Sequence, residues 1–357
     1  MNPYFVHIGG AIGALMMLSL SGCQSLATTS HAHPSMSATA APSVTSPSPA
    51  LKDMTAIDRT GRIAYIEVTQ DKEGIRSAIY ITHPDGSDKH KYAEVDGGIY
   101  SLAWSDDGRY LTYSIQRGRS YPVIYLYDTV TERTTPIINN KGMNLSGQLS
   151  ADNTTLMYTS SDEGETCVYE YDMATGTRRP AINTEWSNSL QPKYLPNGDI
   201  VFVSDKGVNN RPRLYRYDRD ARTVAQITTS GYATSPSISH DGQLMSYLAG
   251  HNAAIMDLNT GKEIADFGST GLEETAKLSP STDYVIYPMR TPNDAPSSAA
   301  NDAPIASQLF IRPLVGEGAP FSLVSSQGVL RDPVWGVMPS VAAKNKPAIK
   351  VITKNNP

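Results

Sequence analysis

Short runs of alternating apolar and polar residues follow one another along most of the chain and predict β-strands. The clearest unit extends from Gly98 to Ile138 and reads SLAWS, a turn at Asp106-Asp107-Gly108, YLTYS, a polar loop, VIYLYD, a second turn and TTPII. β-branched and aromatic residues dominate these runs, as they do in strands. Gly and Asp favour tight turns. The unit therefore predicts four antiparallel strands joined in order.

The same unit recurs with its first turn in register. The later turns centre on Asn153, Gly198, Gly242 and Thr282. Asn is the usual alternative to Gly where the backbone is left-handed. The third strands carry Tyr80, Tyr125, Tyr169 and Tyr215, separated by 45, 44 and 46 residues. A period of about 40 to 45 residues with four strands in each unit is typical of a β-propeller.

We predict an all-β fold, a six-bladed β-propeller of four-stranded antiparallel blades over residues 58–338, with an insertion at 290–307. The first unit lacks a first strand, whereas RDPVWGV, from Arg331 to Val337, matches a first strand and has nothing after it. A C-terminal strand joining the N-terminal blade would close the ring without an exposed edge. The predicted first strands centre on Trp104, Leu149, Tyr194, Ile238, Leu278 and Trp335.

The N-terminal region predicts a lipoprotein. Residues 5–20 form an apolar run that is short for a membrane span and suits a signal peptide over residues 1–22. The run ends at Leu20-Ser21-Gly22-Cys23, which resembles the lipobox of bacterial lipoproteins, and this resemblance implies lipidation of Cys23. The alternatives are an uncleaved anchor or a coincidental LSGC sequence. No Asp follows Cys23, which by the same resemblance favours the outer membrane.

Low-complexity segments flank the repeats. Residues 24–50 contain no charged residue and are rich in Ser, Thr, Ala and Pro, so we expect residues 23–57 to be a disordered tether carrying the lipidated cysteine. Residues 339–357 contain several Lys and no acidic residue, and we expect a disordered basic tail there.

The units LAWSDDGRYLTYS, SPSISHDGQLMSY and IYLYDTVTER resemble the TolB-type propeller repeat, whose first strand ends in W-S-P-D-G and is followed by I-A-F and I-Y-V-M-D strands. The resemblance covers residues 61–337. It implies a six-bladed propeller that binds envelope proteins, since the family binds the peptidoglycan-associated lipoprotein and other Tol-system members. The chain departs from the family because a tether and a lipidation site stand where an α/β domain would precede the propeller.

Composition and motifs argue against several classes of activity. The net charge of −5 is not gathered in one run, which argues against a nucleic-acid partner. No G-x-S-x-G motif occurs, as a propeller-linked serine peptidase would need. Four of the seven His lie within the repeats, at positions that do not predict a three-ligand metal site. We therefore expect no catalytic residues, no metal and no cofactor.

Aromatic and charged residues in the loops at one mouth of the channel form a candidate binding rim, because such side chains are favoured in protein recognition sites. The rim residues are Tyr100, Arg117, Arg119, Tyr121, Trp186, Arg211, Tyr232, Glu273, Glu274 and Arg331. We expect a non-enzymatic cell-envelope lipoprotein that binds a protein or peptide, with a link to Tol-type envelope integrity or transport. It would be held by acyl chains on the periplasmic side of the outer membrane.

One alternative is a carbohydrate-active lyase or hydrolase that uses residues of the channel, and a second is a solitary structural member of an envelope complex, which would co-purify constitutively with its partner. A cluster of His or carboxylates lining the channel would favour the enzyme, and a channel lined by Ser, Thr and backbone would count against it.

Overall fold

The structure is a computed structural model. It describes residues 54–182, 188–206, 211–229, 231–291, 306–316 and 318–351. The expected signal peptide, the lipobox with Cys23 and nearly all of the expected tether lie outside these residues, as does most of the insertion at 290–307. No helix in the described part of the chain is long and apolar enough to cross a membrane.

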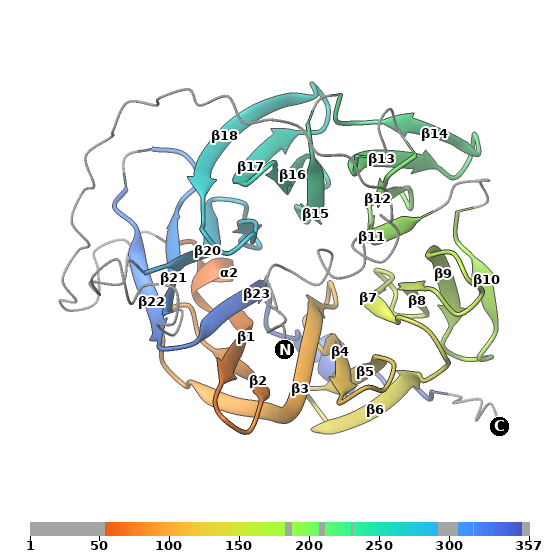
Figure 1. Cartoon of the computed structure of the whole chain (residues 1–357), viewed down its shortest axis with the longest axis horizontal. Coiled ribbons are helices and arrows are strands. Elements are labelled where there is room, and N and C mark those ends of the chain that lie inside the picture. The colour runs from red at the N-terminus through yellow and green to blue at the C-terminus, as the bar shows by residue number, and fades with distance from the viewer. Residues whose placement is uncertain are drawn as a thin grey trace, which may run out of the picture.

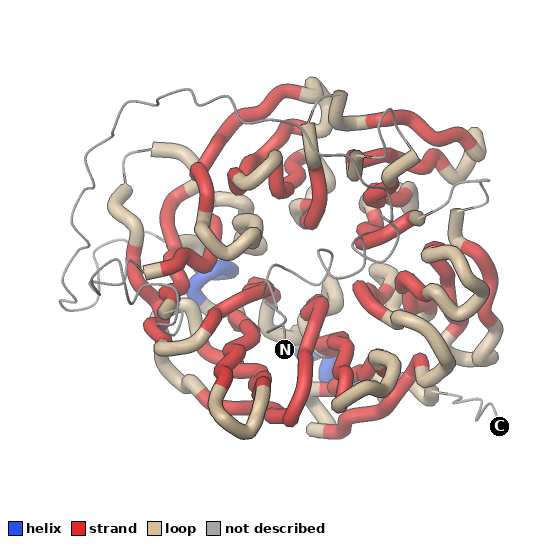
Figure 2. Tube along the Cα trace, viewed as in Figure 1, coloured by secondary structure: helices blue, strands red, loops and turns tan. Residues whose placement is uncertain are grey.

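Five antiparallel sheets are arranged in a ring (Figures 1 and 2). The largest sheet has seven strands in the order β23-β1-β2-β3-β4-β5-β6. Its strands are β1 (Arg62–Gln70), β2 (Ile75–Thr82), β3 (His90–Trp104), β4 (Tyr110–Arg117), β5 (Val123–Asp128), β6 (Arg133–Ile138) and β23 (Val329–Gly336). β23 comes from the far end of the chain and pairs antiparallel with β1.

The other four sheets have four strands each, and every one of them is formed by consecutive strands of the chain. The second sheet contains β7 (Leu145–Leu149), β8 (Thr155–Ser160), β9 (Cys167–Asp172) and β10 (Arg178–Pro180), and the third contains β11 (Ser189–Tyr194), β12 (Ile200–Ser204), β13 (Arg213–Asp218) and β14 (Thr223–Gln226). The fourth contains β15 (Ala233–Ile238), β16 (Leu244–Ala249), β17 (Asn252–Asp257) and β18 (Lys262–Ser269), and the fifth contains β19 (Lys277–Leu278), β20 (Tyr284–Arg290), β21 (Ser307–Pro313) and β22 (Phe321–Ser326). The strands β7, β11, β15 and β23 and the C-terminal part of β3 lie nearest the centre, and β6, β10, β14, β18 and β22 lie at the periphery (Figure 1).

The all-β propeller is confirmed, but the prediction of six separate four-stranded blades is wrong. The described strands form four four-stranded sheets and one seven-stranded sheet, because β3 runs unbroken for 15 residues where the sequence predicts the end of one blade and the start of the next. β3 pairs with β2 as far as Asp96 and with β4 from Gly97 onwards. Gly97 has a φ of 142° and lies against the backbone of Gln116, so the chain changes partner there without ending the strand.

The predicted first turn of each unit is confirmed. The residue expected at the left-handed position has positive φ in all five described turns, including those where Gly is absent: these residues are Gly108, Asn153, Gly198, Gly242 and Thr282. Ser and Asp side chains stabilise the turns. In the first, the Ser105 hydroxyl donates to Asp107 at 2.8 Å and accepts the N–H of Tyr110 at 2.9 Å.

The core lies between neighbouring sheets and between the two halves of the seven-stranded sheet, where apolar side chains face one another. One cluster joins β1 to β4 around Ile66, Ile79 and Leu111, and another joins β5 to the second sheet around Ile124 and Leu156. The short helix α2 (Ala56–Arg59) precedes β1. Its buried Asp58 accepts hydrogen bonds from the hydroxyls of Ser279 and Ser281 in the turn after β19, which fixes the start of the described chain to the fifth sheet.

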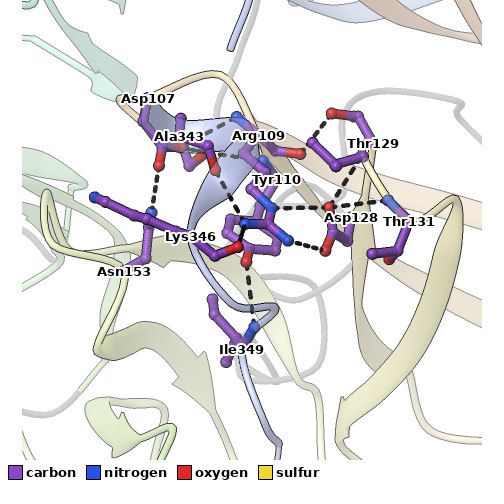
Figure 3. Close-up of polar contacts among 12 residues, drawn as sticks. Asp107, Arg109, Tyr110, Asp128, Thr129, Thr131, Asn153, Ala343, Lys346 and Ile349 are labelled. Atoms are coloured by element: carbon purple, nitrogen blue, oxygen red, sulfur yellow. Dashed lines mark hydrogen bonds and ion pairs between the residues drawn. The ribbon is translucent and has the colours of Figure 1, made fainter. Parts of the chain in front are cut away.

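The C-terminal segment packs against the ring, so the expectation of a disordered tail does not describe residues 341–351. The helix α3 (Val341–Asn345) is followed by an extended segment whose Ile349 and Val351 pack against the core of the second sheet. Arg109 is buried and forms a bidentate pair with Asp128, with N–O distances of 2.7 and 3.0 Å. The same guanidinium donates to the carbonyl oxygens of Ala343 and Lys346, at 3.0 and 2.6 Å (Figure 3).

Candidate functional site

A cavity of about 170 Å³, called the upper cavity, lies at one mouth of the ring, between its inner strands. Residues of β3, β7, β11, β15 and β23 line it, together with the segment before β19 and the start of that strand. A second cavity of about 210 Å³, called the lower cavity, continues the upper cavity towards the opposite mouth. Leu102, Lys193 and Lys277 border both cavities and therefore lie at the level where the two meet.

Each inner segment of the described chain has one non-Gly residue in the left-handed region at the wall of the upper cavity. These residues are Ser101, Ser146, Gln191, Ser235, Glu273 and Asp332, with φ between 48° and 59°. In the five inner strands other than β19 the residue coincides with a shift in register against the next strand, which is a β-bulge. Bulges redirect side chains and are common beside functional sites. Left-handed non-Gly residues cost on the order of 1–3 kcal/mol each.

Two of these left-handed residues connect neighbouring inner strands. Gln191 accepts the backbone N–H of Ser235 at 2.7 Å through its side-chain oxygen. The carboxylate of Asp332 accepts the backbone N–H of Leu102 at 2.7 Å. These contacts fix the spacing of the inner strands, so the wall of the cavity is rigid around its shorter Ser side chains.

The upper cavity is lined by charges of both signs. Glu274 lies 3.5 Å from the guanidinium of Arg331 and accepts the backbone N–H of Asp332 at 3.3 Å. The guanidinium of Arg331 also lies over the ring of Tyr100, 5.8 Å from its centroid. At the rim, Glu273 pairs with the exposed His251 at 2.6 Å. The carboxylates of the cavity are thus engaged with partners on the chain itself.

Burial shifts the pKa of two groups that line the upper cavity. It raises the pKa of Glu274 to about 7, although the positive charge of Arg331 opposes the shift. Burial, followed by the positive charge of Lys277, lowers the pKa of Lys193 to about 8. Both shifts have the direction expected when water is removed from a charged group. The protonation of the cavity therefore changes near neutral pH.

The structure brings five of the ten predicted rim residues together at the upper cavity: Tyr100, Tyr232, Glu273, Glu274 and Arg331. It does not place Arg117, Arg119, Tyr121 or Arg211 among the lining residues. The first three lie at or after the end of β4, and their loop lies outside the wall because β4 and β5 are the second and third strands from the centre. Trp186 lies outside the described residues.

Sequence reasoning missed Lys193 and Lys277, although a signal was available. Each of them directly precedes the predicted centre of a first strand, Tyr194 or Leu278. The residues at this position in all six predicted first strands line the lower cavity: Ala103, Gln148, Lys193, Ser237, Lys277 and Val334. The position faces the channel in every unit, so a Lys there is placed at the centre of the ring.

A carbohydrate-active enzyme, the alternative function, would need a cluster of His or carboxylates in the channel lining. His240 and Asp106 line the lower cavity, whereas His83, His90 and His251 do not border either cavity. Among the described residues, no group of three or more His, Cys, Asp or Glu could hold a metal ion. The upper cavity is lined by the carboxylates Glu273, Glu274 and Asp332 and also by Ser, Thr, Lys and Arg side chains, so it combines the lining expected of the enzyme with that expected of a binding protein.

Comparison with known protein families agrees with the geometry of the ring. The TolB beta propeller domain matches residues 54–338. The chain belongs to this family. Among its curated relatives in the TolB family is the Tol-Pal system protein TolB of Francisella tularensis subsp. tularensis, which is 32% identical over 238 residues. That match covers 53% of this chain and 54% of the relative, so the chain spans about half the length of the curated TolB proteins it matches.

A solved TolB structure has the same fold. The crystal structure of TolB from Acinetobacter baumannii superposes with a TM-score of 0.66 at 26% identity, and the match covers 78% of this chain and 67% of that one. Dipeptidyl-peptidase 5 of Porphyromonas endodontalis is 26% identical over 209 residues, which are 52% of this chain and 28% of the peptidase. The match thus covers a smaller share of the peptidase than the 54% that is covered of the Francisella TolB.

Proposed function

We propose that this chain is a non-enzymatic, lipid-anchored protein of the bacterial cell envelope, whose TolB-type propeller binds a protein or peptide at the upper cavity. Membership of the TolB family and the similarity to Tol-Pal system proteins support a role in the envelope. The proposed address is the periplasmic face of the outer membrane, with acyl chains on Cys23 as the anchor. A link to Tol-type envelope integrity or transport is part of the same proposal.

The observation that carries the binding role is the convergence of the rim residues on one cavity. Tyr100 and Arg331 are 231 positions apart in the sequence and are in contact at its wall. Tyr232 and Glu274 come from two further inner segments and border the same space. Aromatic and Arg side chains at a concave, partly desolvated site are the usual anchors of protein recognition. A rigid wall lowers the entropy lost on binding.

The experiment that tests this function is site-specific photo-crosslinking in intact cells. A photo-reactive phenylalanine derivative replaces Tyr232 at the cavity, and in a matched control it replaces Tyr121, which is 54% exposed and lies outside the cavity. We expect a defined envelope protein to be captured from position 232 and not from position 121. Equal capture from both positions, or none from position 232, would refute binding at the cavity.

The lipid anchor requires a separate test, because Cys23 lies outside the described residues. We expect the native chain to fractionate with outer membranes and to incorporate labelled palmitate. The Cys23→Ala variant should lose the label and leave the membrane fraction. If both proteins fractionate alike without a label, the anchor is refuted while the binding role stands.

A further inference from the structure

Two lysine side chains lie at the centre of the ring, at the junction of the two cavities. Lys277 is buried, with 9% of its surface exposed, and Lys193 is partly buried. Within the part of the chain that the structure describes, neither ammonium group has a hydrogen bond or an ion pair. A partly desolvated charge without a partner is unfavourable, and proteins normally pair such a charge or bind a counter-ion. The two ammonium groups border both cavities and therefore form a positively charged site that suits an anion.

The surrounding carboxylates do not supply that anion. Asp332 interacts with Lys193 over a longer range, but its carboxylate accepts the N–H of Leu102. Glu274 is paired with Arg331, and Glu273 is paired with His251. Among the described carboxylates that line the upper cavity, only that of Asp332 has no cationic partner, so the two ammonium groups leave an excess of about one positive charge. Burial first and the like charge of Lys277 second lower the pKa of Lys193, and the more distant Asp332 opposes this shift.

We propose that Lys193 and Lys277 bind one carboxylate group of a peptide that enters the channel from the rim, carried either by an acidic side chain or by the C-terminus. This inference rests on the proposed function, because the peptide is the partner bound at the upper cavity. The excess of about one charge suits a carboxylate, which carries one negative charge, better than a phosphate, which carries nearly two. Short Ser side chains in the wall above the lysines leave room for an extended segment.

A purely structural role for the lysines leads to different expectations. Charged residues that point inwards also protect the inner edges of sheets from pairing with other chains. In that case the lysines would discourage aggregation, and replacing them would leave the binding of carboxylates unchanged. The experiment below therefore measures binding at the lysines themselves.

The first arm is an NMR titration of the purified full-length chain with its lysines labelled as ¹³C-dimethyl derivatives, which keep their positive charge. The probes are N-acetylglutamate N-methylamide, the matched N-acetylglutamine N-methylamide, and inorganic phosphate. The resonances are assigned with Lys193→Met and Lys277→Met, which replace each side chain with an apolar one of similar length. Lys141→Met, at an exposed position, is the control.

We expect the glutamate probe to shift the resonances of Lys193 and Lys277 and to raise the pKa of Lys193. The glutamine probe should leave both resonances in place, and the resonance of Lys141 should not respond to any probe. Equal shifts with the glutamate and glutamine probes, or a stronger response to phosphate, would overturn the assignment of a carboxylate site. Circular dichroism of the two Met variants confirms that any lost response is not caused by unfolding.

The second arm separates this inference from the proposed function. Carbodiimide, which joins an amine directly to a carboxylate in contact with it, is applied to intact envelopes, and products at Lys193 and Lys277 are identified by mass spectrometry. An isopeptide bond to the protein captured from position 232 supports the proposal. Capture from position 232 without such a bond overturns the proposal and leaves the proposed function intact. A response to the glutamate probe without any captured protein overturns the peptide as ligand together with the proposed function.

Discussion

Replacing Lys193 with Met should stabilise the folded protein, because it removes a partly buried cation that has no partner. The ordinary pKa of Lys is 10.5, and that of Lys193 is about 8. At about 1.4 kcal/mol for each pH unit, this difference corresponds to an upper limit of about 3.5 kcal/mol. Lys193 keeps some contact with solvent, which weakens the penalty. We therefore expect Lys193→Met to raise the free energy of unfolding by about 1–2 kcal/mol at pH 7.

The stability advantage of the Lys193→Met variant should also depend on pH, in a direction set by the low pKa of Lys193. Below pH 8 the lysine is charged in both the folded and the unfolded chain, and the full penalty of burial is present. Between pH 8 and 10.5 the folded chain has released the proton while the unfolded chain still binds it, so the native protein gains stability as pH rises. The advantage of the Met variant should therefore shrink across this interval.

The assay is urea denaturation at pH 7 and at pH 10, followed by far-UV circular dichroism. Lys141→Met is the matched control, because it removes the same charge from an exposed position and should change the stability by less than about 0.5 kcal/mol. A Met variant at position 193 that is less stable than the native protein would refute the reasoning. An advantage that stays constant between pH 7 and pH 10 would do the same.

Three further outcomes follow from other contacts. Asp128→Asn should lower the free energy of unfolding by about 3 kcal/mol, because it leaves the buried guanidinium of Arg109 without its counter-charge, and thermal denaturation measures the loss. Gly108→Ala should destabilise the chain by more than Gly118→Ala, since both have positive φ but only a Cβ at Gly108 would overlap a neighbouring backbone; urea denaturation of both variants compares them. Binding of the glutamate probe should strengthen as pH falls from 8 to 6, because Glu274, whose pKa is about 7, becomes neutral while Lys193 remains charged; NMR titrations at several pH values measure this.

The repeat pattern predicted most of the strands and the turns between them, because the alternation of side chains and the Asp-Gly signals are local. It failed between residues 96 and 98, where Asp-Gly-Gly reads as a break between blades. In the structure Gly97 allows the strand to change partner, and a Gly inside a strand can mark such a close approach as well as a turn. The sequence does not distinguish the two cases, since the deciding contact is with Gln116, 19 positions away.

The candidate site was only half predictable for a similar reason. Rim residues such as Tyr100, which lies within β3, and Tyr232, which lies just before β15, stand where the repeat pattern predicts loops at one mouth, and the structure brings them to one cavity. The loop containing Arg117 could not be placed in this way, because its distance from the centre depends on the order of strands within the sheet. The packing of Ile349 against the second sheet depends on a surface formed by distant residues, which the composition of the tail does not reveal.

The pairing of β1 with β23 has a consequence for how the protein is made. Arg62 pairs with Gly336, so the first strand of the described chain pairs with a segment that is synthesised 274 positions later. During that interval one edge of β1 is open, and open edges recruit strands from other molecules. Pairings across such a long separation also form slowly. A nascent or truncated chain that ends before Val329 should therefore depend on chaperones and aggregate readily, and the first sheet to be started is the last to be completed.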